Sequence, residues 1–312
     1  MLDETATHIA LHSDRAFRYC STSADRGADT PDLEPPVVLQ DDAHDTDERN
    51  PNALEATLHA STPLTSNRII AVAAGKGGVG KTWFSISLSH ALALQHRNVL
   101  LFDADLRLAN VDVQLGLNPA HDIADVLTGQ HTLKDVALAY GDDLFDVVAG
   151  RSGIGWLAKL PAKELNALGR TLADTAQRYD HMILDTGAGV GRIVRKMTGN
   201  AGVVLLLINA DPTSIVDTYV SLKVALAGRP ASDVRIVVNA ADSLRDGIKT
   251  YEALRRACEG FLGKSPPLAG VIRYDPCVPE AIRQQASLLD VYPASMAATD
   301  VQVIARRLVE TV

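Results

Sequence analysis

The chain has 312 residues with a formal net charge of −8, and 46% of its residues are hydrophobic. That length is enough for one large α/β domain or two small ones. Residues 1–66 hold 13 acidic and 4 basic residues, whereas the remainder holds 25 acidic and 26 basic ones. Because the remainder is close to neutral and has no dense basic stripe, the charge distribution argues against a DNA-binding surface.

Three further features limit the class and the location of the protein. The cysteines Cys20, Cys258 and Cys277 form no C-x-x-C pair. This spacing argues against a metal or iron–sulfur site and favours a reducing compartment. The N-terminus lacks a basic stretch followed by an apolar core, and no run of about 18 apolar residues is present. We therefore expect a cytoplasmic protein without a signal peptide or a membrane span.

Residues 1–66 mix Asp, Thr, Ser, Pro and Ala without a sustained period, and residues 41–48 form a charged run that could not bury itself. This composition predicts a mostly disordered acidic segment with a short helix around Ala53–Leu58. The segment is either a solubilising leader or an arm that binds a partner. We expect the folded domain to cover residues 67–312.

From Arg68 onward, β-type runs alternate with helical patterns. Strands are predicted at Arg68–Ala73, Val99–Asp103, Leu144–Val148, Met182–Leu184, Val203–Ile208, Val234–Asn239 and Leu268–Ile272. Helices are predicted at Ala162–Gln177, Thr213–Leu226 and Tyr251–Phe261. Several strands are apolar almost throughout, which is typical of a sheet covered on both faces. The alternation predicts an α/β fold with a mostly parallel, doubly wound sheet and helices on both faces.

The octet that follows the first predicted strand fits the phosphate-binding pattern G-x-x-x-x-G-K-[ST]. Its members are Gly75, Lys76, Gly77, Gly78, Val79, Gly80, Lys81 and Thr82, and we expect these and the next residue, Trp83, to bind the nucleotide. The glycines let backbone N–H groups turn toward an anion, and the following helix points its positive end at it. Lys81 would reach the β- and γ-phosphates, and the Thr82 hydroxyl would bind Mg²⁺. A strand, a glycine-rich turn and a helix are the context that this P-loop motif requires.

Acidic residues end two other predicted strands. Asp103 and Asp105 close an apolar strand one βα unit after the octet, and Asp185 closes another before a glycine-containing loop. Carboxylates at the carboxyl edge of such a sheet lie where ligands bind. One of the pair Asp103 and Asp105 can join the Mg²⁺ shell while the other orients a water. Asp185 has the context of a Walker B acid, which holds the metal.

Two further polar residues lie at the end of a predicted strand or at the start of a predicted helix. Asn239 ends a predicted strand, and its amide could pair with a purine, although an asparagine there is usually a turn residue. Asp211 and Pro212 predict a helix start, with Asp211 as the N-cap.

These motifs resemble those of the MinD/ParA ATPases, whose deviant Walker A motif carries a second lysine where Lys76 stands. The stretch at residues 102–117, the Asp-Pro-Thr-Ser run at 211–214 and residues 278–284 are similar to the flagellar FlhG/FleN branch of that family. The resemblance covers residues 68–290 and implies a slow, Mg²⁺-dependent ATPase that forms a homodimer on ATP and regulates flagellar number or placement.

The resemblance also implies roles for individual residues. Lys76 would cross the dimer interface to the partner subunit's ATP, Asp105 would position the attacking water, and Asp103 would couple a switch loop to the metal. Asp185 would be the Walker B acid. Adenine would be contacted by Asn239, with Arg273 and Asp275 in the nearby loop.

The implied partners are a flagellar signal-recognition-type GTPase, flagellar switch proteins or a flagellar transcription activator. The first of these partners is weakened because residues 1–66 have no DQAxxLR-type element. In addition, Gly187 replaces the first alanine of the usual DTAAG run, and Arg192, Arg195 and Lys196 make the following helix more basic than expected. These departures leave open a positioning ATPase for another polar structure, serving a pilus, cellulose synthesis, or chromosome or plasmid partition. A scaffold that does not hydrolyse ATP is disfavoured because the acids are present.

The C-terminus has a weak amphipathic pattern. Val301, Ile304, Leu308 and Val312 could line one face of a helix, but the segment lacks Trp, Phe and Lys. This is a poor membrane-binding profile. We expect a terminal helix packed on the domain, with at most weak, ATP-dependent membrane contact at the inner face of the cell membrane or at a pole.

Overall fold

The computed structural model describes residues 66–150, 159–228 and 232–311. Contacts divide the chain into the units Met1–Pro63 and Leu64–Val312, and every described residue belongs to the second. The predictions for residues 1–65, including the helix at Ala53–Leu58, lie outside the described residues. The domain boundary at residue 67 stays a prediction.

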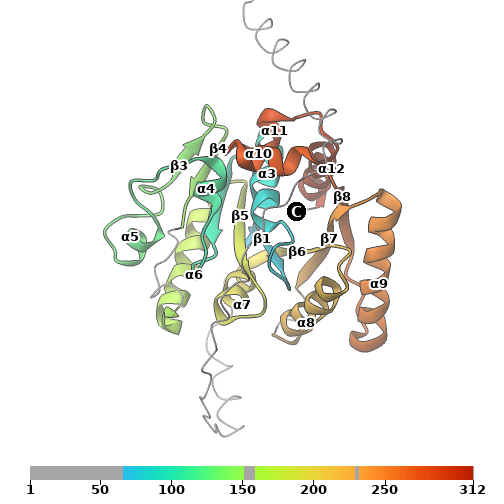
Figure 1. The fold of residues 1–312 in the computed structure, drawn as a ribbon. Coiled ribbons are helices and arrows are strands. Elements are labelled where there is room, and N and C mark those ends of the chain that lie inside the picture. The colour runs from blue at the N-terminus through green and yellow to red at the C-terminus, as the bar shows by residue number, and fades with distance from the viewer. Residues whose placement is uncertain (1–65, 151–158, 229–231, 312) are drawn as a thin grey trace, which may run out of the picture. The chain divides into compact units, whose positions relative to one another are not determined.

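Eight strands form one sheet in the order β3-β4-β2-β5-β1-β6-β7-β8 (Figure 1). All neighbours are parallel except β3 and β4, which are antiparallel. The strands are β1 (Ser66–Ala74), β2 (Val99–Ala104), β3 (Leu138–Tyr140), β4 (Phe145–Val148), β5 (His181–Ala188), β6 (Ala201–Ile208), β7 (Asp233–Ala241) and β8 (Leu268–Arg273). Each predicted strand matches an observed one, and the predicted α/β class is confirmed. The short edge strand β3 was not predicted.

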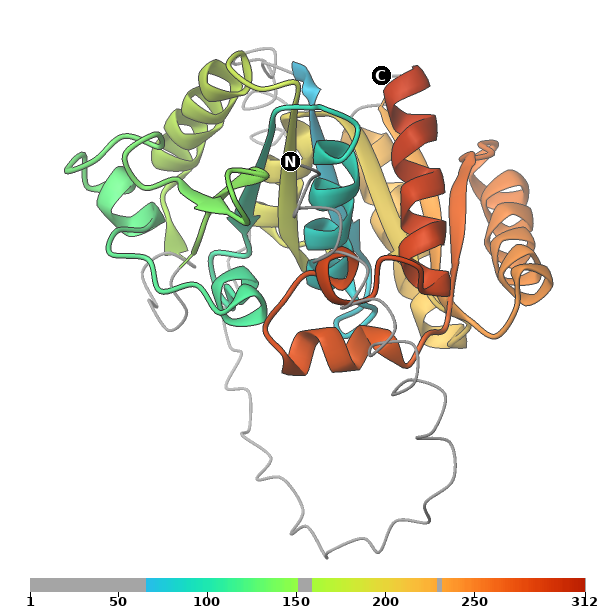
Figure 2. The same ribbon diagram turned by 90° about the horizontal axis from the view of Figure 1, so that it is seen from above.

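Helices cover both faces of the sheet. One face carries α6 (Ala162–Ala176), α7 (Arg192–Gly199), α8 (Pro212–Gly228) and α9 (Leu244–Leu262). The other carries α3 (Lys81–Ala93) and α12 (Met296–Thr311), which lie side by side in Figure 2. Next to α3 pack α4 (Val111–Leu115) and α11 (Leu288–Val291), and α10 (Cys277–Arg283) packs against both of these. The helix α5 (Ile123–Leu127) follows α4 in the chain. The helices predicted at 162–177 and 213–226 match α6 and α8, and α9 begins seven residues before its predicted start.

The two covered faces explain the apolar strands. Side chains alternate between faces along a strand, and in β1 Ile69, Ile70, Ala71 and Val72 are all fully buried. Apolar residues on both faces thus stabilise the sheet from two cores at once. Because the central strands are parallel, their carboxyl ends share one edge. The register there pairs Asp103 with Asp185, and Asp185 with Val72.

The C-terminal helix α12 packs against α3 and β8. Its apolar residues Val301, Ile304 and Leu308 are at most 1% exposed, so the face considered for membrane contact is buried in the domain. Val312 lies outside the described residues. Among the helices that the structure describes, none combines the length and the apolarity needed to cross a bilayer.

Candidate functional site

The predicted phosphate-binding octet forms the turn between β1 and α3. Gly78 and Gly80 have φ angles of 77° and 93°, a left-handed backbone that glycine adopts without strain. A Cβ at Gly75 would collide with the backbone of α8 at Asp217. The first turn of α3 holds no acidic residue, so its positive end faces the loop without a competing carboxylate. The loop therefore has the shape and the charge of a phosphate site.

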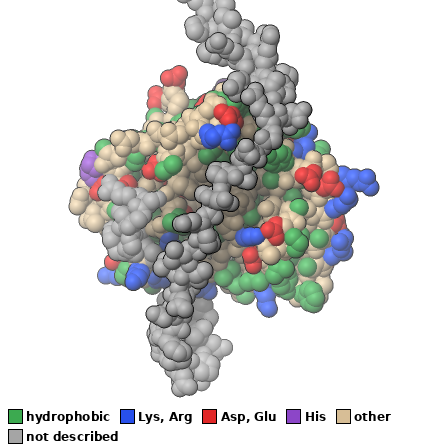
Figure 3. Space-filling view, viewed as in Figure 1, with side chains coloured by type: hydrophobic (Ala, Val, Ile, Leu, Met, Phe, Trp, Pro, Cys, Tyr) green, Lys and Arg blue, Asp and Glu red, His purple; other side chains and the backbone are tan. Residues whose placement is uncertain are grey.

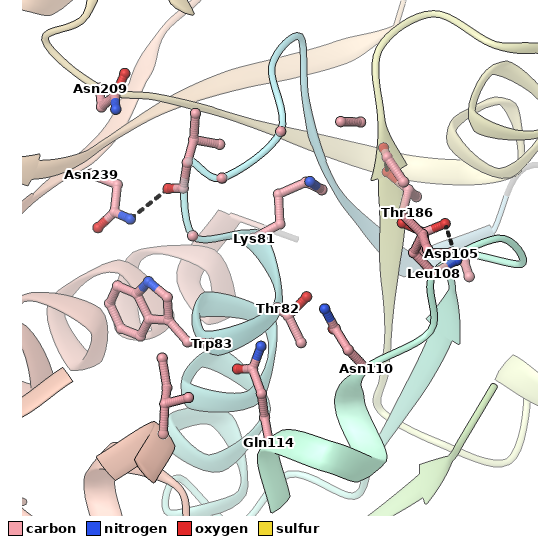
Figure 4. Close-up of a pocket in the computed structure, with 18 of the residues that line it drawn as sticks. Lys81, Thr82, Trp83, Asp105, Leu108, Asn110, Gln114, Thr186, Asn209 and Asn239 are labelled. Carbon is pink, nitrogen blue, oxygen red and sulfur yellow. Dashed lines mark hydrogen bonds between the residues drawn. The ribbon is translucent and has the colours of Figure 1, made fainter. Parts of the chain in front are cut away.

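A cavity of about 790 Å³ opens at this loop. The first turn of α3 supplies Lys81, Thr82 and Trp83 to its wall, and the far ends of other strands supply Asp105 and Asn239. Figure 4 shows these side chains around one space, with Asp105 on one side and Asn239 on the other. The sheet edge thus gathers predicted site residues from segments far apart in the sequence. Lys76, Asp103 and Asp185 do not line this cavity.

Asp185 is 2% exposed and accepts a hydrogen bond from the Ser85 hydroxyl at 3.0 Å. Burial raises the pKa of Asp185 to about 6, while the nearby Thr82 hydroxyl and Lys81 ammonium oppose the rise. Mg²⁺ prefers oxygen ligands and keeps several waters. A hydroxyl backed by a buried carboxylate is such an oxygen set, so Thr82 and Asp185 fit the ion. Ser85, which orients the carboxylate, was not predicted, since one serine in a helix carries no distinguishing pattern.

Asp103 is 1% exposed, and its oxygens accept three backbone N–H groups. Oδ1 takes Asp105 at 3.1 Å, and Oδ2 takes Asn110 at 2.9 Å and Val111 at 3.1 Å. Burial and the neighbouring Asp185 raise the pKa of Asp103 well above its usual range. In this structure Asp103 therefore ties the loop after β2 to the sheet, beside Asp185. A metal contact by Asp103 stays a prediction.

Asp105 lines the cavity, and its Oδ1 accepts the N–H groups of Arg107 and Leu108 at 3.2 Å each. A Cβ at Gly187 would lie 3.2 Å from the carboxylate of Asp105. The glycine at this position is thus matched to the close approach of the acid, which explains the departure from the usual alanine. The end of β5 after Asp185, which the sequence predicted to be a loop, thus lies next to the predicted water-positioning acid.

Lys76 turns toward α8. Its Nζ lies 2.6 Å from Asp211 Oδ2 and 2.7 Å from the Thr213 hydroxyl. The hydrogen bond from Lys76 lowers the pKa of Asp211 to about 2, with help from Thr213. Asp211 also accepts the Thr213 N–H at 2.9 Å, which confirms it as the N-cap. Its contact with Lys76 was missed because only the pairing of β1 with β6 brings the two residues together.

The residues predicted around adenine divide into two kinds. Asn239 is 4% exposed, and its Nδ2 donates to the Val79 carbonyl at 2.7 Å (Figure 4). This bond fixes which end of the amide is nitrogen. Arg273 and Asp275 border the cavity, but the Arg273 guanidinium pairs with Asp300 at 2.8 Å and Asp275 accepts the N–H groups of Cys277 and Ala297. Their side chains hold the loop together, so any contact of theirs with a base stays a prediction.

Residues 70–288 match the family described as the CobQ/CobB/MinD/ParA nucleotide-binding domain. The chain belongs to this family. It is a P-loop ATPase of the MinD/ParA type, with ATP and Mg²⁺ as its cofactors. The predicted membership of the MinD/ParA ATPases is thereby confirmed.

Individual relatives agree with this assignment. The chain is 36% identical over 241 residues to the antiactivator FleN of Pseudomonas aeruginosa, covering 77% of this chain and 86% of FleN. It is 26% identical over 247 residues to the flagellum site-determining protein YlxH of Helicobacter pylori, covering 78% and 82%. Among solved structures, it resembles the septum site-determining protein MinD complexed with Mg-ADP from Pyrococcus horikoshii. That match has 26% identity and a TM-score of 0.65, and it covers 77% of this chain and 95% of MinD.

Proposed function

We propose that this ATPase is a molecular switch that dimerises on Mg·ATP, hydrolyses it slowly and regulates flagellar number or placement. The observation that carries the proposal is the position of Lys76. Its ammonium lies on the outer side of the P-loop with 39% of its side chain exposed, held by α8 rather than by the cavity of its own subunit. A cation in that place can be offered to the triphosphate of a second copy.

Each residue then has a defined task. Lys81 and the loop N–H groups hold the phosphates, and Thr82 with Asp185 holds the metal. Mg²⁺, when bound, neutralises phosphate charge. Asp105 orients the attacking water, while Asp103 links the loop of Asp105 to Asp185. Because Lys76 would bind the partner's nucleotide, loss of the γ-phosphate would weaken the dimer and end the signal.

The flagellar role is supported by the names of two relatives, an antiactivator called FleN and a flagellum site-determining protein. We infer that the partners are flagellar components: a transcription activator, switch proteins or a signal-recognition-type GTPase. The switch would work in the cytoplasm, at the inner membrane face or at a pole. A pull-down with the ATP-loaded full chain tests this part, and capture of pilus or partition proteins in place of flagellar ones would contradict it.

The dimer is tested separately by light scattering of the full chain with Mg²⁺ and a non-hydrolysable ATP analogue. Lys76→Ala should bind the analogue and remain a monomer. Lys81→Ala is the matched control, because it removes an equal charge five residues along the same loop and should lose the nucleotide itself. A Lys76→Ala dimer as stable as that of the parent protein would refute the shared-lysine arrangement, and a monomeric parent would refute the switch.

A further inference from the structure

The indole of Trp83 lies in the nucleotide cavity. Trp83 follows Thr82 in the first turn of α3 and lines the cavity with a partly exposed ring. A Cβ at Gly80 would collide with both the indole Nε1 and the Nδ2 of Asn239. The ring edge and the amide therefore converge on one point beside the P-loop, as the close-up in Figure 4 also shows.

The cavity has a phosphate end and a distal end, and Trp83 stands at the start of the distal end. Lys81, Thr82 and Asp105 mark the phosphate end by their charges and hydroxyl. The distal wall is formed by Asn239 together with Val278 and Ile282 of α10. Because Lys81, Thr82 and Trp83 are consecutive and all line the cavity, a nucleotide whose phosphates lie at the first two residues has the indole beside it.

The surroundings hold the indole in place. It meets the fully buried Phe84 ring edge-on, at 82° with a centroid distance of 6.4 Å. Its other neighbours include Ile86 of α3 and Ile282 of α10, which line a small hollow with it. The structure records no hydrogen bond from the indole Nε1 to any residue that it describes. A fixed aromatic face with an unused donor at its edge suits a flat, polar-edged ring such as a nucleobase.

We propose that Trp83 is the stacking platform for the nucleotide base and makes this ATPase prefer purines to pyrimidines. Stacking strength grows with the area of overlap, so a purine gains more than a pyrimidine. Asn239 then reads the stacked ring: its Nδ2 is turned to Val79, which leaves Oδ1 as an acceptor for the amino group of adenine. The proposal rests on nucleotide binding alone and is independent of the proposed dimer and flagellar role.

The test separates base contacts from phosphate contacts. Calorimetry on the full chain with Mg²⁺ compares ATP, CTP and inorganic tripolyphosphate for the parent, Trp83→Ala and Trp83→Phe. For Trp83→Ala we expect ATP to bind about 10- to 100-fold more weakly, the range that one stacked base supplies, with tripolyphosphate unchanged. The preference for ATP over CTP should shrink, and Trp83→Phe should keep most of it.

A second measurement does not depend on removing the indole. The chain has two tryptophans, Trp83 and Trp156, so Trp156→Phe leaves Trp83 as the single indole emitter. Its fluorescence should change with ATP and stay constant with tripolyphosphate. If Trp83→Ala weakened the binding of ATP and of tripolyphosphate equally, the proposal would be overturned, because the indole would then stabilise the phosphate-binding loop and not contact the base. Unchanged ATP affinity, or an identical fluorescence response to both ligands, would overturn it as well.

Discussion

At the scale of residues, the site separates acids that bind from acids that organise. Asp185 and Asp103 are neighbours in the sheet register and both are buried, yet Asp103 is bonded to three N–H groups of the loop that carries Asp105. A buried carboxylate with such bonds fixes the loop. Asp105 keeps its place in the cavity wall beside Gly187. From the sequence, either Asp103 or Asp105 could have bound the metal or oriented the attacking water. The hydrogen bonds of Asp103 favour Asp105 as the acid that orients the water.

Asp105→Ala should therefore slow hydrolysis while sparing nucleotide affinity. A group that positions a water contributes about 100-fold in rate, and the phosphate contacts of Lys81 and Thr82 do not involve this carboxylate. Phosphate release under saturating ATP measures the rate, and calorimetry measures the affinity. Asp174→Ala on α6 is the control, because it removes an exposed acid remote from the cavity. A turnover within about twofold of the parent would assign the water to another residue.

At the scale of elements, the long apolar strands and the P-loop were predictable because burial on two faces and a glycine pattern leave direct marks in the sequence. β3 was not, since three residues with intermediate or exposed side chains carry no such mark. The short helices α4, α5, α10 and α11 are set by tertiary packing rather than by a period. The start of α9 was missed because its first turns are largely exposed, although Ser243 caps it through the Asp246 N–H.

The packing of α12 gives the first prediction at this scale. Ile304 is 1% exposed and lies over Gly270 of β8, where a Cβ would collide with its side chain. Ile304→Ala removes buried methyl groups and leaves a void, so the free energy of unfolding should fall by about 2–5 kcal/mol. Urea unfolding measures it, with Glu310→Ala on the exposed side of the same helix as control. Parent-like stability would mean that α12 detaches easily, which would reopen the membrane role.

The buried His90 gives the second prediction at the scale of elements. It lies on α3 with 3% exposure, and its Nδ1 is 2.8 Å from the Ser287 hydroxyl at the start of α11. Burial lowers the pKa of His90 below 6.5, with Asp290 opposing. The unfolded chain therefore binds more protons just below pH 6.5, so stability should fall as the pH falls through that value and level off above it.

Urea midpoints at pH 7.5 and 5.5 check this expectation. His90→Gln should narrow the difference between the two pH values, whatever it does to stability at either one. His121→Gln, at a side chain that is 47% exposed, should leave the difference as it is in the parent. Buried His181, whose pKa burial also lowers, should add to the dependence, while Asp185, whose pKa burial raises to about 6, should oppose it. An unchanged pH dependence in His90→Gln would show that α3 and α11 tolerate the charged imidazole.

At the scale of the whole molecule, two anionic groups compete for the Lys76 ammonium: Asp211 in the same subunit and, in the proposed dimer, the triphosphate of the partner subunit. In the single subunit its ammonium is neutralised by Asp211, and the two side chains are 39% and 38% exposed. In the proposed dimer it would face a triphosphate of far higher charge. The acidity of the sequence lies in residues 1–66, while the rest is near neutral, and Figure 3 shows acidic and basic side chains interspersed on one face. Association of the folded parts therefore meets little net repulsion, and local pairs such as this one decide it.

Asp211→Asn should thus strengthen the ATP-dependent dimer. Each of the two monomers gives up an exposed, solvent-screened ion pair when the dimer forms, so without these pairs the dimer dissociation constant should fall by about twofold to about 30-fold. Light scattering across protein concentrations, with Mg²⁺ and a non-hydrolysable analogue, measures it. Asp233→Asn is the matched control, because it breaks a pair with Arg235 at 2.7 Å, close to the 2.6 Å between Lys76 and Asp211, at the opposite end of the strands. Lys76→Ala, which should remain a monomer, should still be one when Asp211→Asn is added, since the carboxylate acts only through the lysine. A weaker dimer for Asp211→Asn would instead assign the carboxylate to the interface, as a group that holds Lys76 ready for the partner.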